Sequence, residues 1–295
     1  MLTICPTPIG NLDDATPRQK RALAEADVIA CEDTRRTGKL LEHLGIEREG
    51  GRPRLVSHHE HNEQEAVERL TPALKAGRSV VLVSDAGTPA ISDPGYRLVR
   101  RAIEEEVPIE SLPGPNAAVV ALAASGLPTH AFQFRGFPPT TSEGRQSFLR
   151  EVDVDGVTTT LYESPNRVLE LVRDVSEVLG EEREVCVARE LTKRHEEYIR
   201  GRAAEVVEEL AGRERVRGEC VVVIAAGDGD DGPTDEEIDR KIEELLERGL
   251  SARTIKEVIS ELYEVSRSSL YERIEALKAS ATALGAVQTR SPAMR

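Results

Sequence analysis

Short apolar runs alternate with amphipathic stretches along the first part of the chain. The apolar runs predict five strands, at Leu2 to Pro6, Val28 to Cys31, Arg54 to Ser57, Val80 to Ser84 and Ile109 to Leu112. Helix signals fall between them: Thr16 and Pro17 form a cap with proline at the first helical position, and Gly45 and Gly77 lie where helices end. This alternation predicts a mostly parallel sheet covered by helices.

The loops that follow these strands are rich in glycine and proline, and the clearest are Thr7 to Asn11 and Asp85 to Gly95. Ligands of open α/β sheets bind at the carboxyl ends of the strands, so we expect a site at these loops. The loop from Asp85 to Gly95 is long and has little to pack into a core, which favours a functional role.

A second series of strands begins after Pro113-Gly114-Pro115. We predict strands at Ala131 to Arg135, Val157 to Tyr162, Glu184 to Glu190 and Glu219 to Ala226. Helices near Asn166 to Leu179 and Ala203 to Gly212 separate the last three. The pattern predicts a second α/β lobe.

The segment from Gly227 to Pro233 is a linker by composition, because it has no apolar residue to bury. Beyond it, apolar residues recur at helical spacing in three groups: Ile238, Ile242, Leu245 and Leu246; Ile255, Val258, Ile259 and Leu262; and Leu270, Ile274 and Leu277. We predict three domains, an N-terminal lobe (1–113), a second lobe (114–227) and a helical, helix-turn-helix-like domain (233–280), with a disordered tail from Ala279 onward.

The composition of the 295-residue chain fits a soluble globular protein, with 39% hydrophobic residues and no run of about eighteen apolar residues. The residues after Met1 do not have the pattern of a signal peptide, so we predict a cytoplasmic protein. Four widely spaced cysteines, Cys5, Cys31, Cys186 and Cys220, lie in or beside apolar runs and are interpreted as reduced core thiols. We predict no metal site, because the histidines around His59 have no second ligand cluster to complete one.

The net charge of −14 argues against a general nucleic-acid binder, since phosphate binding leaves a basic surface on a domain. The net charge of the whole chain, however, does not give the charge of one cleft. Only seven of the 39 basic residues are lysine, and an acidic, lysine-poor surface also fits adaptation to high internal salt, which we hold as a hypothesis.

Eight motifs occur in order along the chain. They are Thr7-Pro8-Ile9-Gly10-Asn11, Glu32-Asp33-Thr34-Arg35, His59-Glu60-His61-Asn62-Glu63, Val83 to Gly95, Leu112 to Pro115, Gly136 to Pro139, Tyr162 to Arg167, and Ala188 to Lys193. In this order they resemble the ribosomal RNA branch of the tetrapyrrole methylase superfamily. Asn116 and Asn166 depart from that family's usual residues, which bears on fine specificity.

The resemblance implies a two-lobed α/β fold, the class III methyltransferase fold, with the helical domain appended. It also implies methylation, from S-adenosylmethionine, of the ribose 2′-hydroxyl of a cytidine in the decoding region of 16S ribosomal RNA in the small subunit, by a homodimer. The cofactor contacts that it carries over to this chain are Pro8, Asp85, Thr88, Asn116, Ala117, Glu163 and Leu191.

The base that would take the hydroxyl proton is not singled out by the sequence. The candidates are the polar members of the motifs: Glu32, Asp33, His59, Arg189, Glu190 and Lys193. For each, an ion pair that fixes a loop is an equal alternative. Arg35, Arg36, Arg189 and Lys193 are candidates for RNA phosphate contacts, with surface ion pairs as the competing interpretation. Phe132 and Phe134 alternate as buried strand residues would, although both lie near the motif loops.

Two other functions stay open. A tetrapyrrole C-methyltransferase of the same superfamily would share the cofactor pocket, and the second and eighth motifs and the helical C-terminal domain argue against it. A DNA-binding regulator would use the helix-turn-helix-like domain. From Pro233 to Ser280, however, there are eight basic residues against twelve acidic, a net charge of −4, which is unfavourable for docking in the major groove.

Overall fold

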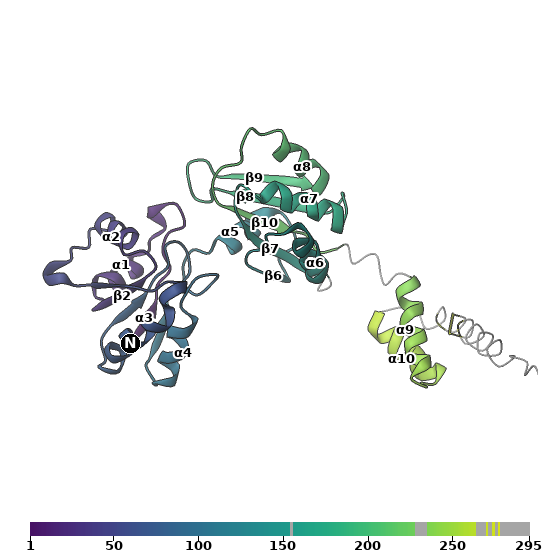
Figure 1. Cartoon of the computed structure of the whole chain (residues 1–295), viewed down its shortest axis with the longest axis horizontal. Coiled ribbons are helices and arrows are strands. Elements are labelled where there is room, and N and C mark those ends of the chain that lie inside the picture. Colours follow the sequence, from purple (N-terminus) through teal and green to yellow (C-terminus); the bar gives the residue numbers. More distant parts are fainter. Residues whose placement is uncertain (154–155, 228–234, 264–269, 271–272, 275–276, 278–295) are drawn as a thin grey trace, which may run out of the picture. The chain divides into compact units, whose positions relative to one another are not determined.

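The computed structural model describes residues 1–153, 156–227, 235–263, 270, 273–274 and 277 (Figure 1). The chain divides into two compact units, Met1–Gly227 and Asp228–Arg295. The first unit contains both five-stranded sheets, and the second is helical where it is described.

The first sheet is entirely parallel, which confirms the prediction of a mostly parallel sheet. Its strands are β1 (Leu2–Ile4), β2 (Val28–Cys31), β3 (Arg54–Ser57), β4 (Val80–Leu82) and β5 (Ile109–Ser111), in the order β3-β2-β4-β1-β5. The strands β1 and β4 end two residues before the predicted positions. The two further residues that were predicted for each strand belong instead to the loops that carry the motifs. The backbone groups of these loops form hydrogen bonds with other loops.

The helices of this lobe follow the signals in the sequence. They are α1 (Pro17–Ala24), α2 (Thr34–His43), α3 (Glu63–Lys75) and α4 (Tyr96–Glu104), with short 3-10 helices η1 (Leu12–Asp14), η2 (Glu49–Gly51) and η3 (Glu60–Asn62). Thr16 caps α1 in a reciprocal pair of hydrogen bonds with Gln19, which confirms the predicted start. Gly45 and Gly77 have φ of 68° and 73° just beyond α2 and α3, a conformation that favours glycine, so the predicted ends are also confirmed.

The two faces of the first sheet build two separate cores. Val80 and Leu82 pack on one face with Leu2 and Leu98, whereas Val81 packs on the other with Ile29. All of these residues are buried, as expected for a parallel sheet that is covered on both faces. The rigid sheet fixes the carboxyl ends of its strands, from which the site loops extend.

The second sheet is mixed. Its strands are β6 (Phe132–Phe134), β7 (Thr158–Glu163), β8 (Glu184–Arg189), β9 (Glu197–Arg202) and β10 (Cys220–Ile224), in the order β6-β7-β10-β8-β9. Only β6 and β7 pair in parallel; the other neighbours are antiparallel. The edge strand β9 was not predicted, because its sequence Glu-Tyr-Ile-Arg-Gly-Arg buries only Ile199 and has no apolar run. Phe132 at the other edge is 46% exposed, so its interpretation as a core residue was wrong.

Helices cover both faces of the second sheet. They are α5 (Ala117–Ser125), α6 (Ser142–Asp153), α7 (Val168–Leu179) and α8 (Ala203–Ala211). The predictions for α7 and α8 are confirmed to within two residues at each end, whereas α5 and α6 were not predicted. Ala121 and Leu122 of α5 pack against Val221, Val223 and Ala188 on one face, and α6 to α8 cover the core on the other.

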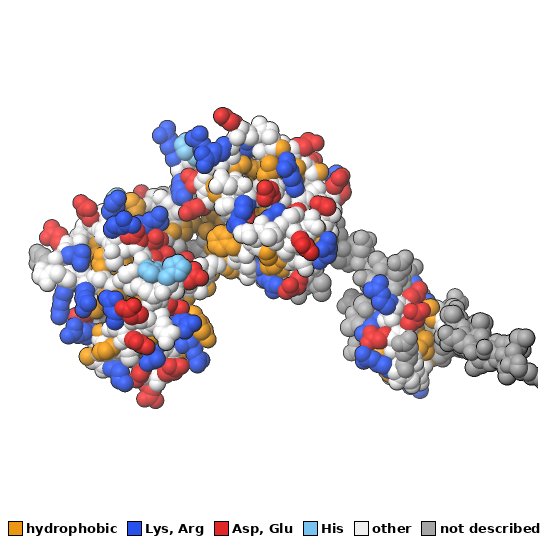
Figure 2. All heavy atoms as spheres, viewed as in Figure 1, with side chains coloured by type: hydrophobic (Ala, Val, Ile, Leu, Met, Phe, Trp, Pro, Cys, Tyr) orange, Lys and Arg blue, Asp and Glu red, His pale blue; other side chains and the backbone are white. Residues whose placement is uncertain are grey.

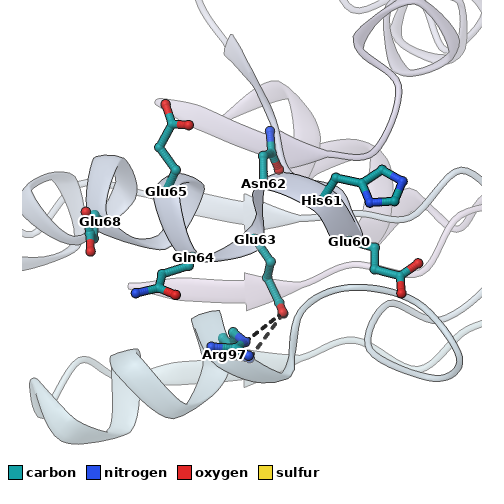
Figure 3. Close-up of a pocket in the computed structure, with 8 residues that line it drawn as sticks. All are labelled: Glu60, His61, Asn62, Glu63, Gln64, Glu65, Glu68 and Arg97. Carbon is teal, nitrogen blue, oxygen red and sulfur yellow. Dashed lines mark hydrogen bonds and ion pairs between the residues drawn. The ribbon is translucent and has the colours of Figure 1, made fainter.

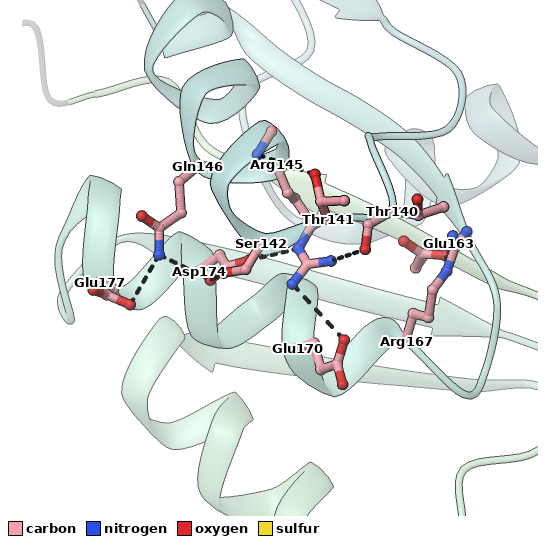
Figure 4. Close-up of polar contacts among 11 residues, drawn as sticks. Thr140, Thr141, Ser142, Arg145, Gln146, Glu163, Arg167, Glu170, Asp174 and Glu177 are labelled. Carbon is pink, nitrogen blue, oxygen red and sulfur yellow. Dashed lines mark hydrogen bonds and ion pairs between the residues drawn. The ribbon is translucent and has the colours of Figure 1, made fainter.

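A buried ion pair joins α6 to α7 (Figure 4). Arg145 Nε donates to Asp174 Oδ2 over 2.5 Å, and the two side chains are only 3% and 7% exposed. Thr140 O accepts a hydrogen bond from the same guanidinium, and Gln146 donates to the other oxygen of Asp174. Because all these groups have partners, the pair can be buried without leaving an isolated charge.

The second unit contains α9 (Asp235–Glu247) and α10 (Ala252–Tyr263). Its core is formed by Ile238, Ile242, Leu245, Ile255, Ile259, Leu270 and Ile274. The helical spacing of these apolar residues is therefore confirmed, except that Val258 is 37% exposed and the side chain of Leu262 lies outside the described residues. The predicted linker after Gly227, most of the third helix and the tail lie outside the described residues, so the domain boundaries stay predictions.

Two observations bear on the broad class of the protein. The four cysteines are buried and free, which confirms their interpretation as core thiols. Within the described ranges, no helix has the length and apolarity needed to cross a membrane.

Candidate functional site

A cavity of about 450 Å³ lies where loops of the two lobes meet. Loops at the carboxyl ends of β1, β2 and β4 form one side of it, and residues at the start of α5, after β7 and around the start of β10 form the other. The lining residues are Ile9, Glu32, Arg36, Asp85 to Thr88, Ile91 to Asp93, Asn116, Ala117, Phe137, Tyr162 to Pro165, Leu191 and Glu219 to Val221.

Six of the seven predicted cofactor contacts line this cavity: Asp85, Thr88, Asn116, Ala117, Glu163 and Leu191. The seventh, Pro8, lines an adjoining hollow of about 380 Å³ instead, together with Arg36, Thr37 and Asp85. These six residues, up to 106 positions apart in the sequence, therefore gather around one space. Their individual roles stay predictions.

The loops after β1 and β4 hold each other in place. The backbone groups of Thr7 and Gly87 exchange two hydrogen bonds of 2.9 Å, and Thr7 Oγ1 donates to Ser84 O. Gly87 has a φ of 82°, and a Cβ atom there would lie 3.3 Å from the Ile9 side chain. Glycine at this position therefore serves both the turn and the close approach of the two loops.

The loop after β4 is also tied to the start of α5. Thr88 Oγ1 donates to Pro115 O over 2.8 Å, and Asn116 Oδ1 accepts hydrogen bonds from the backbone nitrogens of Ala118 and Val119. Asn116 is thus the N-cap of α5, and the neighbouring Ala117 lines the cavity. The positive end of the α5 dipole faces this region, which suits a carboxylate or another anionic group.

Glu163 supplies an acceptor that no protein group uses. Its Oε1 accepts from Ser164 N and from the Arg167 guanidinium, which lies 2.6 Å away (Figure 4). Its Oε2 is buried in the cavity region and has no hydrogen-bond partner among the described residues. An unsatisfied buried carboxylate oxygen is costly, so this atom points to a ligand with a hydrogen-bond donor.

Three carboxylates, Glu32, Asp85 and Asp93, cluster on the N-terminal side of the cavity. Burial raises the pKa of Glu32 to about 7, and the negative charges of Asp93 and Asp85 add to this effect. Burial also raises the pKa of Asp93 to about 6. The sequence did not single out Asp93; its only signal was its position in the same Gly- and Pro-rich loop as Asp85.

The third carboxylate, Asp85, is fully engaged by its surroundings. Asp33 N donates to its Oδ1 over 3.1 Å, and Arg36 Nη1 lies 3.1 Å from its Oδ2. The motif that follows β2 therefore fixes the orientation of Asp85. Of the predicted catalytic candidates, only Glu32 lines the cavity.

The other candidates from the second and eighth motifs form ion pairs. Asp33 caps α2 and pairs with Arg35 at 2.8 Å, and these contacts lower the pKa of Asp33. Arg189 pairs with Glu197, which also binds Arg213. Lys193 pairs with Glu190 and Glu219. These contacts favour a structural interpretation for Asp33, Arg189, Glu190 and Lys193.

The segment from His58 to Glu63 contacts the loop after β4 but does not line the cavity. His58 is buried, which lowers its pKa, and His59 N donates to Asn62 Oδ1. The Glu63 side chain points to Arg97, which it contacts at 3.1 Å (Figure 3). A surface hollow of about 500 Å³ lies here, and His59 is not part of its lining. No group of three or more His, Cys, Asp or Glu in the described ranges is arranged to hold a metal ion.

Comparison with known proteins identifies close relatives of this chain. Residues 1–207 match the family of tetrapyrrole (corrin/porphyrin) methylases. The "Ribosomal RNA small subunit methyltransferase I" of Escherichia coli O157:H7 is 40% identical over 272 residues, which cover 92% of this chain and 93% of that protein. The protein of the same name from Halalkalibacterium halodurans is 48% identical over 77% of this chain and 76% of its own length.

Solved structures share the fold at lower identity. Diphthine synthase superimposes with a TM-score of 0.58 at 16% identity and covers 76% of this chain and 89% of its own. Uroporphyrin-III C-methyl transferase from Thermus thermophilus, in complex with S-adenyl homocysteine, superimposes with a TM-score of 0.51 at 18% identity over 76% of this chain and 96% of its own. The matched part corresponds in extent to the unit that holds both sheets.

Proposed function

This chain belongs to the tetrapyrrole (corrin/porphyrin) methylase family, and we propose that it transfers a methyl group from S-adenosylmethionine to the RNA of the small ribosomal subunit. The acceptor that we propose is the ribose 2′-hydroxyl of a cytidine in the decoding region, which the order of the eight motifs implies. The observation that carries the proposal is the convergence of six predicted cofactor contacts on one cavity.

Relatives named for ribosomal RNA methylation match most of this chain at 39–48% identity, whereas the tetrapyrrole methylases among the similar structures lie at or below 22%. This difference favours the RNA branch over a tetrapyrrole acceptor. It also favours an enzyme over a DNA-binding regulator.

The cavity fits S-adenosylmethionine in size and chemistry. Its volume of about 450 Å³ lies within the range of small-molecule sites, and its walls combine apolar side chains with a few polar groups. The free Oε2 of Glu163 matches a donor such as an amino group or a ribose hydroxyl. When bound, the cofactor supplies an electrophilic methyl group on a positively charged sulfur. The carboxylate of Asp85 adds negative potential that favours such a cation.

Two features around the cavity suit an RNA acceptor. Phe137 lines the cavity, is 58% exposed and packs edge-to-face on Tyr162 with ring centroids 5.5 Å apart, so its outer face is available to stack on an unpaired base. Arg194, His195, Arg215 and Arg217 are exposed on the loops before β9 and β10. Figure 2 shows Lys and Arg side chains gathered over the loops at this end of the second sheet, although the chain as a whole is acidic.

These two loops lie side by side next to the cavity. Lys193 Nζ donates to Glu219 over 3.0 Å, and Arg189 Nη1 donates to Arg217 O over 3.2 Å. Leu191 and Glu219 of the same loops line the cavity. The arginines are therefore positioned to hold phosphates while a nucleotide enters the cavity. The homodimer and the cytoplasmic location remain expectations from the resemblance and the sequence.

The test is transfer of a labelled methyl group from S-adenosylmethionine to small ribosomal subunits that lack the modification. Alkaline hydrolysis then locates the nucleotide, because a 2′-O-methyl group blocks cleavage at its site. Protection at one decoding-region cytidine, lost in Asp85→Ala and kept in the exposed control Glu42→Gln, would support the proposal. Transfer to no RNA by a protein that still binds the cofactor would refute it.

A further inference from the structure

Five carboxylates line the cavity, and three of them have cationic partners. Asp85 pairs with Arg36, Glu163 with Arg167 and Glu219 with Lys193. Within the described part of the chain, Glu32 and Asp93 have no such partner. Ion pairing keeps a carboxylate ionised but makes it a poor proton acceptor, so these two remaining groups are the ones suited to accept a proton near neutral pH.

Glu32 and Asp93 face each other from two loops, one after β2 and one after β4. Both side chains line the cavity, and the protonation of each affects the pKa of the other. Ser84 Oγ is within hydrogen-bond distance of the carbonyl oxygens of Ala86 and Gly87, in the loop that carries Asp93. The Oε1 atom of Glu32, in contrast, is buried and has no partner among the described residues. Glu32 therefore presents a buried oxygen that is available to accept a proton.

We propose that Glu32 is the general base that accepts the proton of the ribose 2′-hydroxyl, and that Asp93 is a positioning residue that acts through Glu32. This inference rests on the proposed function. The O–H bond of the hydroxyl breaks and its proton moves to Glu32. The hydroxyl oxygen forms a bond to the methyl carbon, and the bond between that carbon and sulfur breaks, with its electron pair left on sulfur. The proton later leaves to solvent, so Glu32 is regenerated.

Burial and the charged groups around it set the pH dependence of Glu32. Asp85 and Asp93 face it from the loop after β4 and hold its pKa up, whereas Arg36 of α2 is occupied by Asp85. Burial raises the pKa of Tyr162 of β7, and the charge of Asp93 adds to this effect. A carboxylate whose pKa lies near neutral is well matched to proton transfer at physiological pH. Methyl transfer therefore rises with pH through about 7 and then levels off.

The experiment is single-turnover methyl transfer to unmodified small subunits from pH 5.5 to 8.5, with the wild type, Glu32→Gln, Asp93→Asn and the exposed control Glu42→Gln. We expect Glu32→Gln to lose about 100-fold or more in rate at pH 7.5. Asp93→Asn should lose less and shift the midpoint of the profile to lower pH, because it removes a negative charge beside Glu32. A wild-type rate in Glu32→Gln would overturn the proposal.

Two measurements without turnover separate this role from others. Infrared titration of the wild type should show protonated carboxyl bands that disappear near neutral pH, and Glu32→Gln should lack the component that titrates near pH 7 and keep that of Asp93. Calorimetry should give equal affinities of wild type and Glu32→Gln for S-adenosylmethionine and for S-adenosylhomocysteine. If Glu32→Gln bound S-adenosylmethionine more weakly but S-adenosylhomocysteine equally well, and its methyl-transfer rate at saturating S-adenosylmethionine were unchanged, Glu32 would only balance the sulfonium charge. That result would refute the inference. A wild type that methylates no ribosomal RNA would instead refute the proposed function.

Discussion

Gly95 N donates a hydrogen bond to the Glu63 carboxylate over 3.1 Å, and this contact joins the start of α3 to the end of the loop that carries Asp85 and Asp93. Arg97 at the start of α4 holds the same carboxylate at 3.1 Å. The third motif therefore supports the site through the backbone of the loop, at a position where Gly95 adopts a φ of 146°.

The variant Glu63→Ala should loosen this loop and weaken S-adenosylmethionine binding by about ten-fold, since a hydrogen bond to a charged group contributes about 1.5–3 kcal/mol. Isothermal titration calorimetry measures the change. The matched control is Glu65→Ala, because the Glu65 side chain is 73% exposed and forms a long surface ion pair with Arg69, at 3.9 Å. Equal affinities in the two variants would contradict this role of Glu63.

The buried pair of Arg145 and Asp174 should matter for folding. Asp174→Ala leaves a guanidinium that is 3% exposed without its main partner, so we expect a loss of about 3–5 kcal/mol in the free energy of unfolding. The exposed pair of Arg135 and Glu151, at 2.9 Å, is the control, and Glu151→Ala should cost less than about 1 kcal/mol. Urea unfolding checks both values, and similar losses in the two variants would argue against the importance of burial.

Gly10 marks the contact between the first loop and the eighth motif. A Cβ atom there would lie 2.8 Å from Leu191 O and 2.5 Å from Lys193 Cγ, and the carbonyl belongs to a backbone that cannot move away cheaply. Gly10→Ala should displace Leu191 from the cavity wall and weaken cofactor binding while the protein stays folded. In Gly38→Ala, on α2, the added methyl group meets nothing within 4 Å, so this control should keep its affinity and gain about 0.5–1 kcal/mol in stability. Unchanged affinity in Gly10→Ala would count against the close packing.

The exposed arginines beside the cavity should contribute to the binding of RNA and not to the binding of the cofactor. Replacing Arg194, Arg215 and Arg217 by Glu should raise the KM for small subunits by at least about ten-fold and reduce its salt dependence, because fewer counterions are released. The affinity for S-adenosylmethionine should not change. Arg150→Glu, an exposed position on α6, is the control. An unchanged KM in the triple variant would mean that the RNA binds elsewhere.

The sequence predicted the parallel sheet well because its strands are uniformly apolar and separated by capped helices, as at Thr16 and Gly45. It failed at β9, an edge strand whose Glu, Arg and Gly residues give no apolar alternation, and at α5, which carries too few polar residues to show a helical face. That Asp85, Thr88 and Glu163 belong to one site was predicted only through the family resemblance.

The carboxyl pair shows what local pattern cannot reveal. Glu32 and Asp93 lie 61 positions apart, and their mutual effect depends on burial and distance, which only the folded loops define. The ion pairs of Asp33, Arg189 and Lys193 are likewise invisible in sequence. For that reason six polar motif residues were equally good candidates before the structure separated Glu32 from the rest.

The raised pKa of Glu32 has a consequence for stability. The pKa is about 7 in the folded protein against an ordinary value of 4.5, so the folded state holds a proton that the unfolded state releases. The stability that comes from this proton is fully present below about pH 4.5 and is lost as the pH rises through about 7. Above that pH the folded protein carries a buried carboxylate among Asp85 and Asp93 without a cationic partner in the described residues.

Glu32→Gln removes that cost, because glutamine is neutral at every pH. The melting temperature of this variant should rise relative to the wild type between pH 4.5 and about 7, and the difference should be constant at higher pH. Scanning calorimetry from pH 4.5 to 8.5 checks this, with Glu42→Gln as an exposed control that shows no such trend. If the difference between Glu32→Gln and wild type were independent of pH, Glu32 would be ionised throughout. A variant that is more stable but slower in methyl transfer is the pattern of a residue kept for catalysis at the expense of stability.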